Sequence, residues 1–225
     1  MNKFYVVATP IGNLEDITYR AVRILSEVDL ILCEDTRVTI NLLNKYGINK
    51  PTMSYHSQSK LSKIDKILDL INEGKTLALV SDAGTPTISD PGSVLVSKIR
   101  ESFTDIEIIA IPGPSALVSA LSVSGLPASE FIFLGFLPHK KGRETLFKEI
   151  SNTERTVVFY ESPHRIMKTL DSLKKYIGER KIVVARELSK IYEQIISGNS
   201  EEVEKYFIDN KDKVRGEFVV LISTK

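Results

Sequence analysis

Residues 76–86 read TLALVSDAGTP, an apolar strand-like run that leads directly into a loop rich in glycine and proline. Thr76–Val80 and Ile106–Ile111 are apolar runs of the kind that forms strands buried on both faces of a parallel sheet. Ser59–Glu73, before the first run, has apolar residues at helical spacing and ends at Gly74. The alternation of strand and helix predicts an α/β protein with a mostly parallel sheet and helices on both of its sides.

The alternation continues along the rest of the chain. In the first half we expect further strands and helices at Phe4–Ala8, Thr18–Val28, Asp29–Cys33 and Arg37–Tyr46. Asp90 and Pro91 predict a helix start, with the acid as N-cap and the proline in the first position. The second half is less regular, and its expected strands are Phe131–Gly135, Thr156–Tyr160, Lys181–Arg186 and Phe218–Ile222. The break at Pro112–Pro114 predicts a domain boundary, with domains at residues 1–113 and 114–225.

Composition bounds the class of protein. The 225 residues are 42% hydrophobic and 26% charged, as in ordinary globular proteins, which excludes a disordered chain. The apolar runs are far shorter than the ~20 residues that a membrane span needs, and the start lacks a secretory cleavage site. Cys33, the single cysteine, cannot form an internal disulfide and lies in a predicted buried strand. We therefore expect a cytoplasmic protein with no membrane partner.

Three loops that contain glycine and proline directly follow predicted strands, at residues 8–13, 81–86 and 111–116. Ligands of open α/β sheets bind outside the carboxyl ends of the strands, where all three loops should emerge. Glycine lets main-chain groups approach a ligand, and proline stiffens the loop beforehand. The alternative is three ordinary turns between strand and helix. Neither glycine-rich phosphate-binding pattern is present, which favours a nucleotide-like ligand held without a phosphate grip.

Seven motifs occur in order between Phe4 and Ile222. They are Ala8–Leu14 (ATPIGNL), Glu34–Arg37 (EDTR), Ser81–Pro86 (SDAGTP), Ile111–Ala116 (IPGPSA), Gly135–Pro138 (GFLP), Phe159–Arg165 (FYESPHR) and Ala185–Leu188 (AREL). With this set the sequence resembles the tetrapyrrole methylase superfamily, and within it the branch that methylates the ribose 2′-oxygen of a cytidine in small-subunit (16S) ribosomal RNA. The first loop lacks the G-x-G-P-G-type turn of the tetrapyrrole-modifying members, which favours the RNA branch.

The resemblance implies two α/β domains with S-adenosylmethionine in the cleft between them, in a homodimer. Residues 1–113 would carry the substrate side and part of the cofactor site, and residues 114–225 the rest of the cofactor site. The implied cofactor contacts are Pro10, Asp82, Ala83, Gly84, Pro86, Ile88, Ser115, Ala116, Leu134, Gly135, Phe136, Leu137 and Gly216. A sulfonium cation with an adenine and an amino-acid tail needs main-chain polar groups and apolar walls more than cationic side chains.

The motif Glu34–Arg37 follows a predicted strand at the same edge of the sheet. A ribose hydroxyl is a poor nucleophile while protonated, and a carboxylate within hydrogen-bond reach can take that proton. We therefore predict Glu34 or Asp35 as the general base and Arg37 as the residue that grips a substrate phosphate. The alternative is a capped helix start, with Asp35 or Thr36 as N-cap and Arg37 in solvent.

Contacts with ribosomal RNA or the small ribosomal subunit must come from local patches, because the net charge is only +1. The clearest patch is the run at residues 139–143. Its basic residues Lys140, Lys141 and Arg143 are predicted to meet the RNA backbone. The alternative is a run of charges in solvent.

Two further residues are predicted to contact the substrate. His164 is expected in the first turn of a helix, where the helix dipole disfavours its charged form; the alternative is a surface histidine. Arg186 ends a strand, and an intramolecular ion pair is the alternative there. No cluster of His, Cys and Asp has metal-ligand spacing, so no metal is expected.

Two other functions fit the same motifs. A methyltransferase of this superfamily can act on a tetrapyrrole or on a protein side chain. A non-catalytic RNA-binding factor in ribosome assembly would keep the fold but fail to bind S-adenosylmethionine. The intact glycine and proline loops favour the enzyme over this factor.

Overall fold

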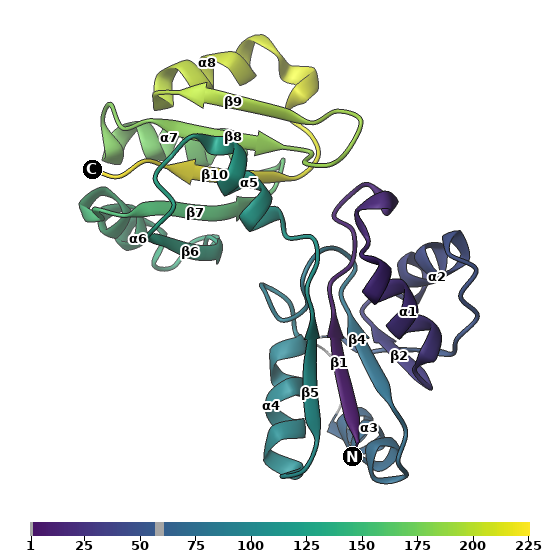
Figure 1. Ribbon diagram of the computed structural model, residues 1–225. Coiled ribbons are helices and arrows are strands. Elements are labelled where there is room, and N and C mark those ends of the chain that lie inside the picture. Colours follow the sequence, from purple (N-terminus) through teal and green to yellow (C-terminus); the bar gives the residue numbers. More distant parts are fainter. Residues whose placement is uncertain (1, 57–60) are drawn as a thin grey trace. The chain divides into compact units, whose positions relative to one another are not determined.

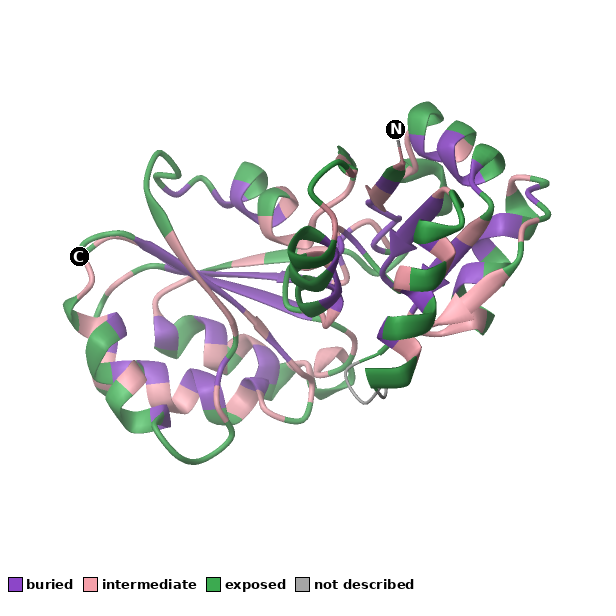
Figure 2. Ribbon diagram, turned by 90° about the horizontal axis from the view of Figure 1, so that it is seen from below, coloured by how far each residue is buried: buried purple, intermediate pink, exposed green. Residues whose placement is uncertain are grey.

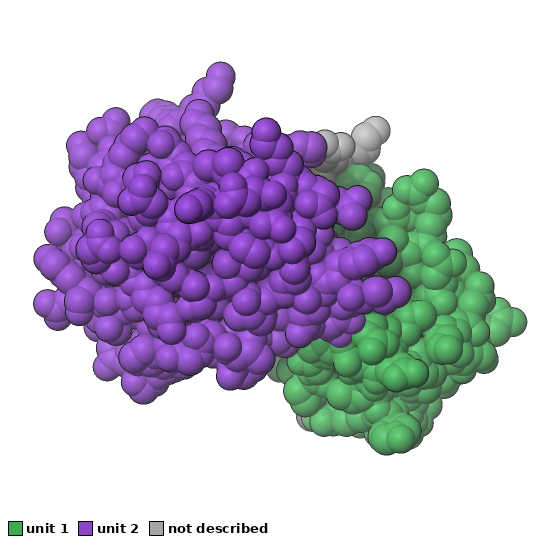
Figure 3. Space-filling model, turned by 90° about the horizontal axis from the view of Figure 1, so that it is seen from above, with its two compact units in different colours: residues 1–115 green, residues 116–225 purple. Residues whose placement is uncertain are grey.

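The computed structural model describes residues 2–56 and 61–225 (Figure 1). The chain divides into two compact units, Met1–Ser115 and Ala116–Lys225 (Figure 3). Each unit has a five-stranded sheet and its own hydrophobic core. The predicted α/β class with two α/β domains is confirmed. In the described part of the chain, no helix has the length and apolar character that crossing a membrane requires.

The sheet of unit 1 is wholly parallel, with strands in the order β3-β2-β4-β1-β5. Its strands are β1 Lys3–Val7, β2 Leu30–Cys33, β3 Thr52–Ser54, β4 Leu77–Val80 and β5 Glu107–Ile111. β4 is buried along its whole length, and Cys33 is buried at the end of β2, as predicted. The short β3 was not predicted, because three residues carry no periodic pattern.

Helices cover both faces of this sheet (Figure 1). They are α1 Tyr19–Glu27, α2 Thr36–Lys45, α3 Leu61–Asn72 and α4 Gly92–Ser102. Leu25 of α1 shares a core with Ala78 of β4, whereas Ile67 of α3 and Leu95 of α4 share a core with Leu79. Successive residues of β4 therefore face opposite sides of the sheet, and each side has its own helical layer.

Two details of unit 1 differ from the prediction. β5 is not buried on both faces, because it lies at the edge of the sheet with Glu107 exposed. α4 begins at Gly92, one residue later than predicted, so Pro91 is the N-cap. The helix expected at Ser59–Glu73 is α3, and the expected residues 59–60 lie outside the described residues.

The sheet of unit 2 is mixed, with strands in the order β6-β7-β10-β8-β9. β6 and β7 are parallel, and the other neighbouring pairs are antiparallel. Its strands are β6 Phe131–Phe136, β7 Thr156–Glu161, β8 Ile182–Arg186, β9 Gln194–Gly198 and β10 Phe218–Ile222. Four of these strands match the prediction closely. β9 was missed, because it is a half-exposed edge strand without a clear apolar run.

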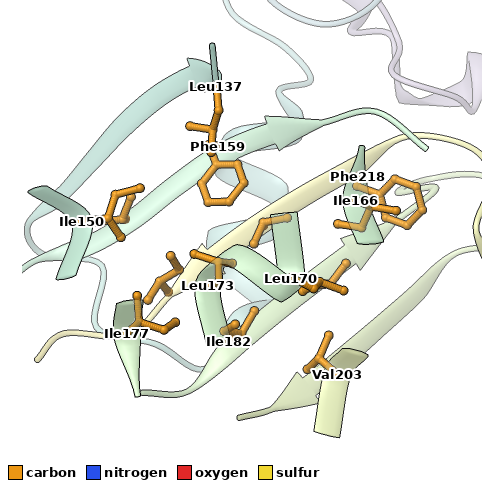
Figure 4. Packing of buried hydrophobic residues seen from close by; sticks show 14 of the residues in the cluster. Leu137, Ile150, Phe159, Ile166, Leu170, Leu173, Ile177, Ile182, Val203 and Phe218 are labelled. Atoms are coloured by element: carbon orange, nitrogen blue, oxygen red, sulfur yellow. The ribbon is translucent and has the colours of Figure 1, made fainter. Parts of the chain in front are cut away.

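Three helices pack on one face of this sheet, and its three central strands β7, β10 and β8 are buried, whereas the edge strands β6 and β9 are partly exposed (Figure 2). They are α6 Arg143–Asn152, α7 Ile166–Ile177 and α8 Ser200–Asp209. Leu170 and Leu173 of α7 lie against the sheet in the same core as Phe159 and Phe218 (Figure 4). The remaining helix, α5 Ala116–Ser124, packs on β8, β9 and β10 outside this core. The described residues also include two short 3-10 helices, Leu14–Asp16 and Lys211–Lys213.

The segment after β7 starts its helix later than predicted. Ser162–Arg165 forms a turn, and α7 begins only at Ile166 with Arg165 as N-cap. His164 is exposed in this turn and does not lie in the first helical turn, so the helix-dipole argument does not apply to it. Its role as a substrate contact stays a prediction.

Candidate functional site

Three neighbouring strands of unit 1 carry the predicted loops. β4, β1 and β5 are adjacent and parallel, so the loops that follow them all start at the same end of the sheet (Figure 1). This is the end formed by the carboxyl ends of the strands, where open α/β sheets bind ligands. The prediction that the three loops share one edge is confirmed.

The first two loops are joined by main-chain hydrogen bonds. The N–H of Thr9 donates to the carbonyl of Gly84 at 2.9 Å, and the N–H of Gly84 donates to the carbonyl of Thr9 at 3.1 Å. The buried hydroxyl of Thr9 also donates to the carbonyl of Ser81 at 2.9 Å. Gly84 has a φ of +82°, and an added Cβ would lie 3.4 Å from Cγ2 of Ile11. The positive φ therefore favours glycine here, and the contact with Ile11 leaves little room for a side chain larger than a methyl group.

The third loop is tied to the other two. The N–H of Ala8 donates to the carbonyl of Ile111 at 3.2 Å, and the hydroxyl of Thr85 donates to the carbonyl of Pro114 at 3.1 Å. The loops thus form one cluster at the end of the sheet. It contains the predicted cofactor residues Pro10, Asp82, Ala83, Gly84, Pro86 and Ser115.

A fourth loop, after β2, joins this cluster through Asp82. The N–H of Asp35 donates to Oδ1 of Asp82 at 3.0 Å. The Asp35 carboxylate caps α2 by accepting from the N–H of Arg37 at 2.9 Å, and it also pairs with Nη2 of Arg37 at 2.6 Å. The structure therefore shows the capped helix start that was the alternative reading. The Arg37 side chain remains 88% exposed, so its guanidinium is accessible to a phosphate.

The two carboxylates of the fourth loop have opposite pKa shifts. Hydrogen bonds from Arg37 lower the pKa of Asp35 to about 2, which makes it a weak base. Burial raises the pKa of the half-buried Glu34, and the negative charges of Asp90 and Asp82 raise it further. Of the two predicted bases, Glu34 is therefore the better proton acceptor.

Asp90 holds the segment between the second loop and α4. Its Oδ2 accepts from the N–H of Thr87 at 2.7 Å, and its Oδ1 accepts from the N–H of Gly92 at 2.7 Å. Thr87 and Ser89 have positive φ values of 75° and 61°, which cost about 1–3 kcal/mol each. The predicted cofactor contact Ile88 lies between them and is partly exposed. Sequence reasoning assigned Asp90 to the helix start alone and missed that it also fixes this strained segment.

The predicted cofactor contacts in unit 2 lie in three separate segments, of which the first is Ala116 at the start of α5. Leu134–Leu137 covers the end of β6, next to a shift in its register with β7; Phe136 is exposed there, whereas Leu137 belongs to the core. Gly216 has a φ of +89° and packs so closely on the side chain of Glu187 that an added Cβ would collide with it. This packing requires a glycine whether or not a ligand binds.

The predicted basic patch divides into exposed and buried residues. Lys140 and Lys141 are exposed in the turn before α6. Arg143 is only 8% exposed, and it donates to the hydroxyl of Thr169 at 2.6 Å and to the carbonyl of Pro138 at 3.2 Å. A guanidinium held in this way is not free to grip an RNA phosphate, which corrects the role predicted for Arg143.

Arg186 is also buried, at 3% exposed. Its guanidinium donates to the carbonyl of Arg215 at 2.8 Å and to the carbonyl of Tyr192 at 3.1 Å. These partners within unit 2 leave the guanidinium of Arg186 no exposed face for the predicted substrate contact. The alternative, an intramolecular ion pair in this region, is present between Lys190 and Glu187, at 2.9 Å.

The cluster of loops suits a ligand of the expected chemistry. It offers main-chain groups fixed by cross-loop hydrogen bonds, together with the apolar side chains of Ile11 and Ile88. Gly84 is itself buried with both main-chain groups bonded to Thr9, so it holds the loops together, whereas Asp82 and Ala83 beside it are exposed. These features match the needs of a cationic sulfonium ligand with an adenine. Within residues 2–56 and 61–225, no group of three His, Cys, Asp or Glu side chains could hold a metal ion.

Residues 3–204 match the family model of the tetrapyrrole (corrin/porphyrin) methylases. The matched segment includes all four loops of the cluster. The chain therefore belongs to the tetrapyrrole methylase family.

Within this family, the chain is similar over its whole length to relatives named ribosomal RNA small subunit methyltransferase I. The protein of that name from Thermotoga maritima is 49% identical over 226 residues, which cover 100% of both chains. The protein of that name from Bacillus subtilis is 44% identical over 225 residues, or 99% of this chain and 75% of the relative. The resemblance to the small-subunit ribosomal RNA methyltransferases of this family is thereby confirmed.

Solved structures of more distant members have the same fold. The cobalamin biosynthetic enzyme cobalt precorrin-4 methyltransferase has a TM-score of 0.70 at 17% identity, covering 98% of this chain and 94% of its own. A putative diphthine synthase from Entamoeba histolytica has a TM-score of 0.70 at 14% identity, covering 100% and 94%. At these identities the likeness shows the fold alone.

Proposed function

We propose that this protein transfers a methyl group from S-adenosylmethionine to the ribose 2′-oxygen of a cytidine in small-subunit ribosomal RNA. The observation that carries the proposal is the 49% identity, over the full length of both chains, to a relative named ribosomal RNA small subunit methyltransferase I. The cluster of joined loops at the sheet edge supports it, because the loops present fixed main-chain groups where this fold class binds ligands.

The residues that would hold S-adenosylmethionine belong to these loops. They are Pro10, Asp82, Ala83, Gly84, Pro86, Ile88 and Ser115. When bound, the cofactor supplies an electrophilic methyl group. The bridge between Thr9 and Gly84 fixes the backbone beforehand, so little conformational freedom is lost on binding. The contributions of Ala116, Leu134–Leu137 and Gly216 stay predictions.

Glu34 and Arg37 act on the RNA in this proposal. Glu34 takes the proton of the ribose hydroxyl, and its raised pKa supports this role. Arg37 binds a backbone phosphate through its exposed guanidinium, while Asp35 holds the other side of that group. Holding the hydroxyl in line with the methyl carbon is worth about 7–11 kcal/mol of the barrier when both reactants are well fixed.

The remaining RNA contacts are proposed at Lys140, Lys141 and His164, which are exposed. Arg143 and Arg186 are not among them, because both guanidinium groups are buried on partners within unit 2. The substrate implies a cytoplasmic location, where bacterial ribosomes are assembled. The homodimer stays a prediction.

The proposal is tested with isotopically labelled S-adenosylmethionine and small ribosomal subunits from cells that lack this protein. After the reaction, the RNA is digested and its nucleosides are separated by mass spectrometry. We expect label on a cytidine ribose. Cofactor binding without label in the RNA would overturn the RNA assignment and leave the acceptor among small molecules or proteins.

A further inference from the structure

Four side chains of unit 2 form a hydrogen-bonded network around Glu161, the last residue of β7. Oε1 of Glu161 pairs with Nη2 of Arg165 at 2.7 Å, and the hydroxyl of Thr169 donates to Oε2 at 2.6 Å. Nη2 of Arg143 donates to the same hydroxyl at 2.6 Å. Because a hydroxyl can donate one hydrogen bond while accepting another, Thr169 links Arg143 to Glu161.

The two arginines of this network also hold the main chain of residues 137–142, which we call the basic loop. Nη1 of Arg165 donates to the carbonyl of Leu137 at 2.8 Å, and Nη1 of Arg143 donates to the carbonyl of Pro138 at 3.2 Å. Arg143 is itself the first residue of α6, directly after the loop. One network therefore fixes the loop where it begins and where it ends.

The basic loop presents its charges outward from this fixed base. His139, Lys140 and Lys141 are exposed, whereas Leu137 is buried in the core. The backbone of the loop is thus anchored while its cationic side chains remain in solvent. Such a surface suits a polyanion whose charges are spaced along a backbone, as in RNA.

Glu161 holds the network together electrostatically. Its side chain is fully buried, where a carboxylate is stable only when it is paired and hydrogen-bonded. Burial lowers the pKa of Arg143, the charge of Glu161 opposes that shift, and the charge of Arg165 adds to it. Without the carboxylate, the two guanidinium groups would repel each other, Arg165 would lose its ion-pair partner and the Thr169 hydroxyl its acceptor.

We propose that Glu161 is a positioning residue for the RNA substrate, which acts through Arg165, Thr169 and Arg143 to fix the basic loop so that Lys140 and Lys141 meet backbone phosphates. The inference rests on the proposed function for the identity of the substrate. Glu161 touches neither reactant in this account, so its loss changes the affinity for the substrate and leaves the chemical step intact.

The first test measures amide hydrogen exchange in Glu161→Gln and Thr169→Val. Both changes break the network while nearly preserving side-chain volume, and Thr169→Val is the milder one in case Glu161→Gln does not fold. We expect exchange in the basic loop to become about tenfold faster, and exchange in α8 to stay unchanged. Ser172→Ala is the matched control, because it removes an exposed hydroxyl from the same helix.

The second test is a double-mutant cycle on the Kd for small ribosomal subunits. Glu161→Gln and the pair Lys140→Ala, Lys141→Ala should each raise the Kd by about 3- to 10-fold, with the kcat at saturation retained. The variant that combines all three substitutions should have the same Kd as the variant with only the two lysines replaced, because Glu161 acts through those lysines.

The inference would be overturned if the increases in Kd caused by Glu161→Gln and by the lysine pair multiplied in the combined variant. It would also be overturned if the exchange rate of the basic loop stayed unchanged in Glu161→Gln and Thr169→Val. Neither the exchange rate nor the Kd requires turnover. A wild-type protein that binds the subunit but does not methylate it would therefore contradict the proposed function, while the cycle still decides the role of Glu161.

Discussion

Thr9 and Gly84 exchange two main-chain hydrogen bonds, at 2.9 Å and 3.1 Å, across the ends of the neighbouring strands β1 and β4. The pair continues the sheet beyond its parallel strands as an antiparallel bridge. Because the Thr85 hydroxyl ties the same segment to Pro114, a disturbance at Gly84 would spread to all three loops.

Replacing Gly84 by valine should abolish the binding of S-adenosylmethionine in a calorimeter. Valine is strained at a φ of +82°, and its side chain would press on Ile11 and separate the loops. Gly74→Val is the matched control, since Gly74 has a φ of +84° but open space around an added Cβ. Equal loss of binding in both variants would mean that backbone strain alone is responsible, which would contradict a role of the Gly84 contact.

Replacing Arg37 by alanine should leave the affinity for S-adenosylmethionine unchanged and raise the KM for the ribosomal substrate several-fold. The Arg37 side chain is exposed and bound to Asp35, so its loss removes a phosphate contact without opening the core. Arg100→Ala, an exposed arginine on α4, controls for the loss of one positive charge. Normal methylation by the Arg37 variant would contradict the role of Arg37 as a phosphate contact.

Replacing Leu170 by alanine should lower the free energy of unfolding by about 2–5 kcal/mol, measured by urea denaturation. Leu170 is fully buried on α7, in the core that Figure 4 shows. Ile208→Ala on α8 is the control, because Ile208 is 51% exposed and should change the stability little. A loss of similar size in both variants would contradict the placement of α7 on the sheet.

The part of the site that follows from topology was predictable. Strand runs and the loops after them are local features, and parallel strands place their carboxyl ends at one edge, so the meeting of the loops at 8–13 and 81–86 followed from the sequence. The choice between Glu34 and Asp35 did not follow. It depends first on the burial of Glu34 and on the hydrogen bonds from Arg37 to Asp35, and then on Asp90 and Asp82, which the fold brings near from another part of the chain.

The direction of side chains was the part that the sequence could not supply. Residues 139–143 have the composition of an exposed basic patch. Gly142, however, adopts a left-handed conformation with a φ of +80°, and α6 starts immediately after it. Arg143 is thereby turned toward Thr169 in the neighbouring helix, whereas Lys140 and Lys141 stay in solvent. Spacing along a chain does not predict such a turn.

Replacing Glu34 by glutamine should lower kcat by about 10²–10⁴-fold, because the amide cannot accept the ribose proton. Asp35→Asn should have a much smaller effect on kcat, since a carboxylate with a pKa of about 2 contributes little as a base. Single-turnover methylation with saturating cofactor measures both variants. A larger loss of kcat in Asp35→Asn than in Glu34→Gln would mean that Asp35, and not Glu34, is the general base.

Replacing Asp82 by asparagine should move the acidic limb of the kcat profile toward lower pH. Glu34 must be ionised to act as base, so activity falls as the pH drops through its pKa, and the raised pKa places that fall above the usual glutamate range. Asparagine removes one of the two negative charges that raise this pKa, while its Oδ1 can still accept from the N–H of Asp35. Burial and Asp90 still act on Glu34, so the limb should shift only part of the way. A limb that stays in place, in a variant that binds the cofactor normally, would mean that another group titrates in the reaction.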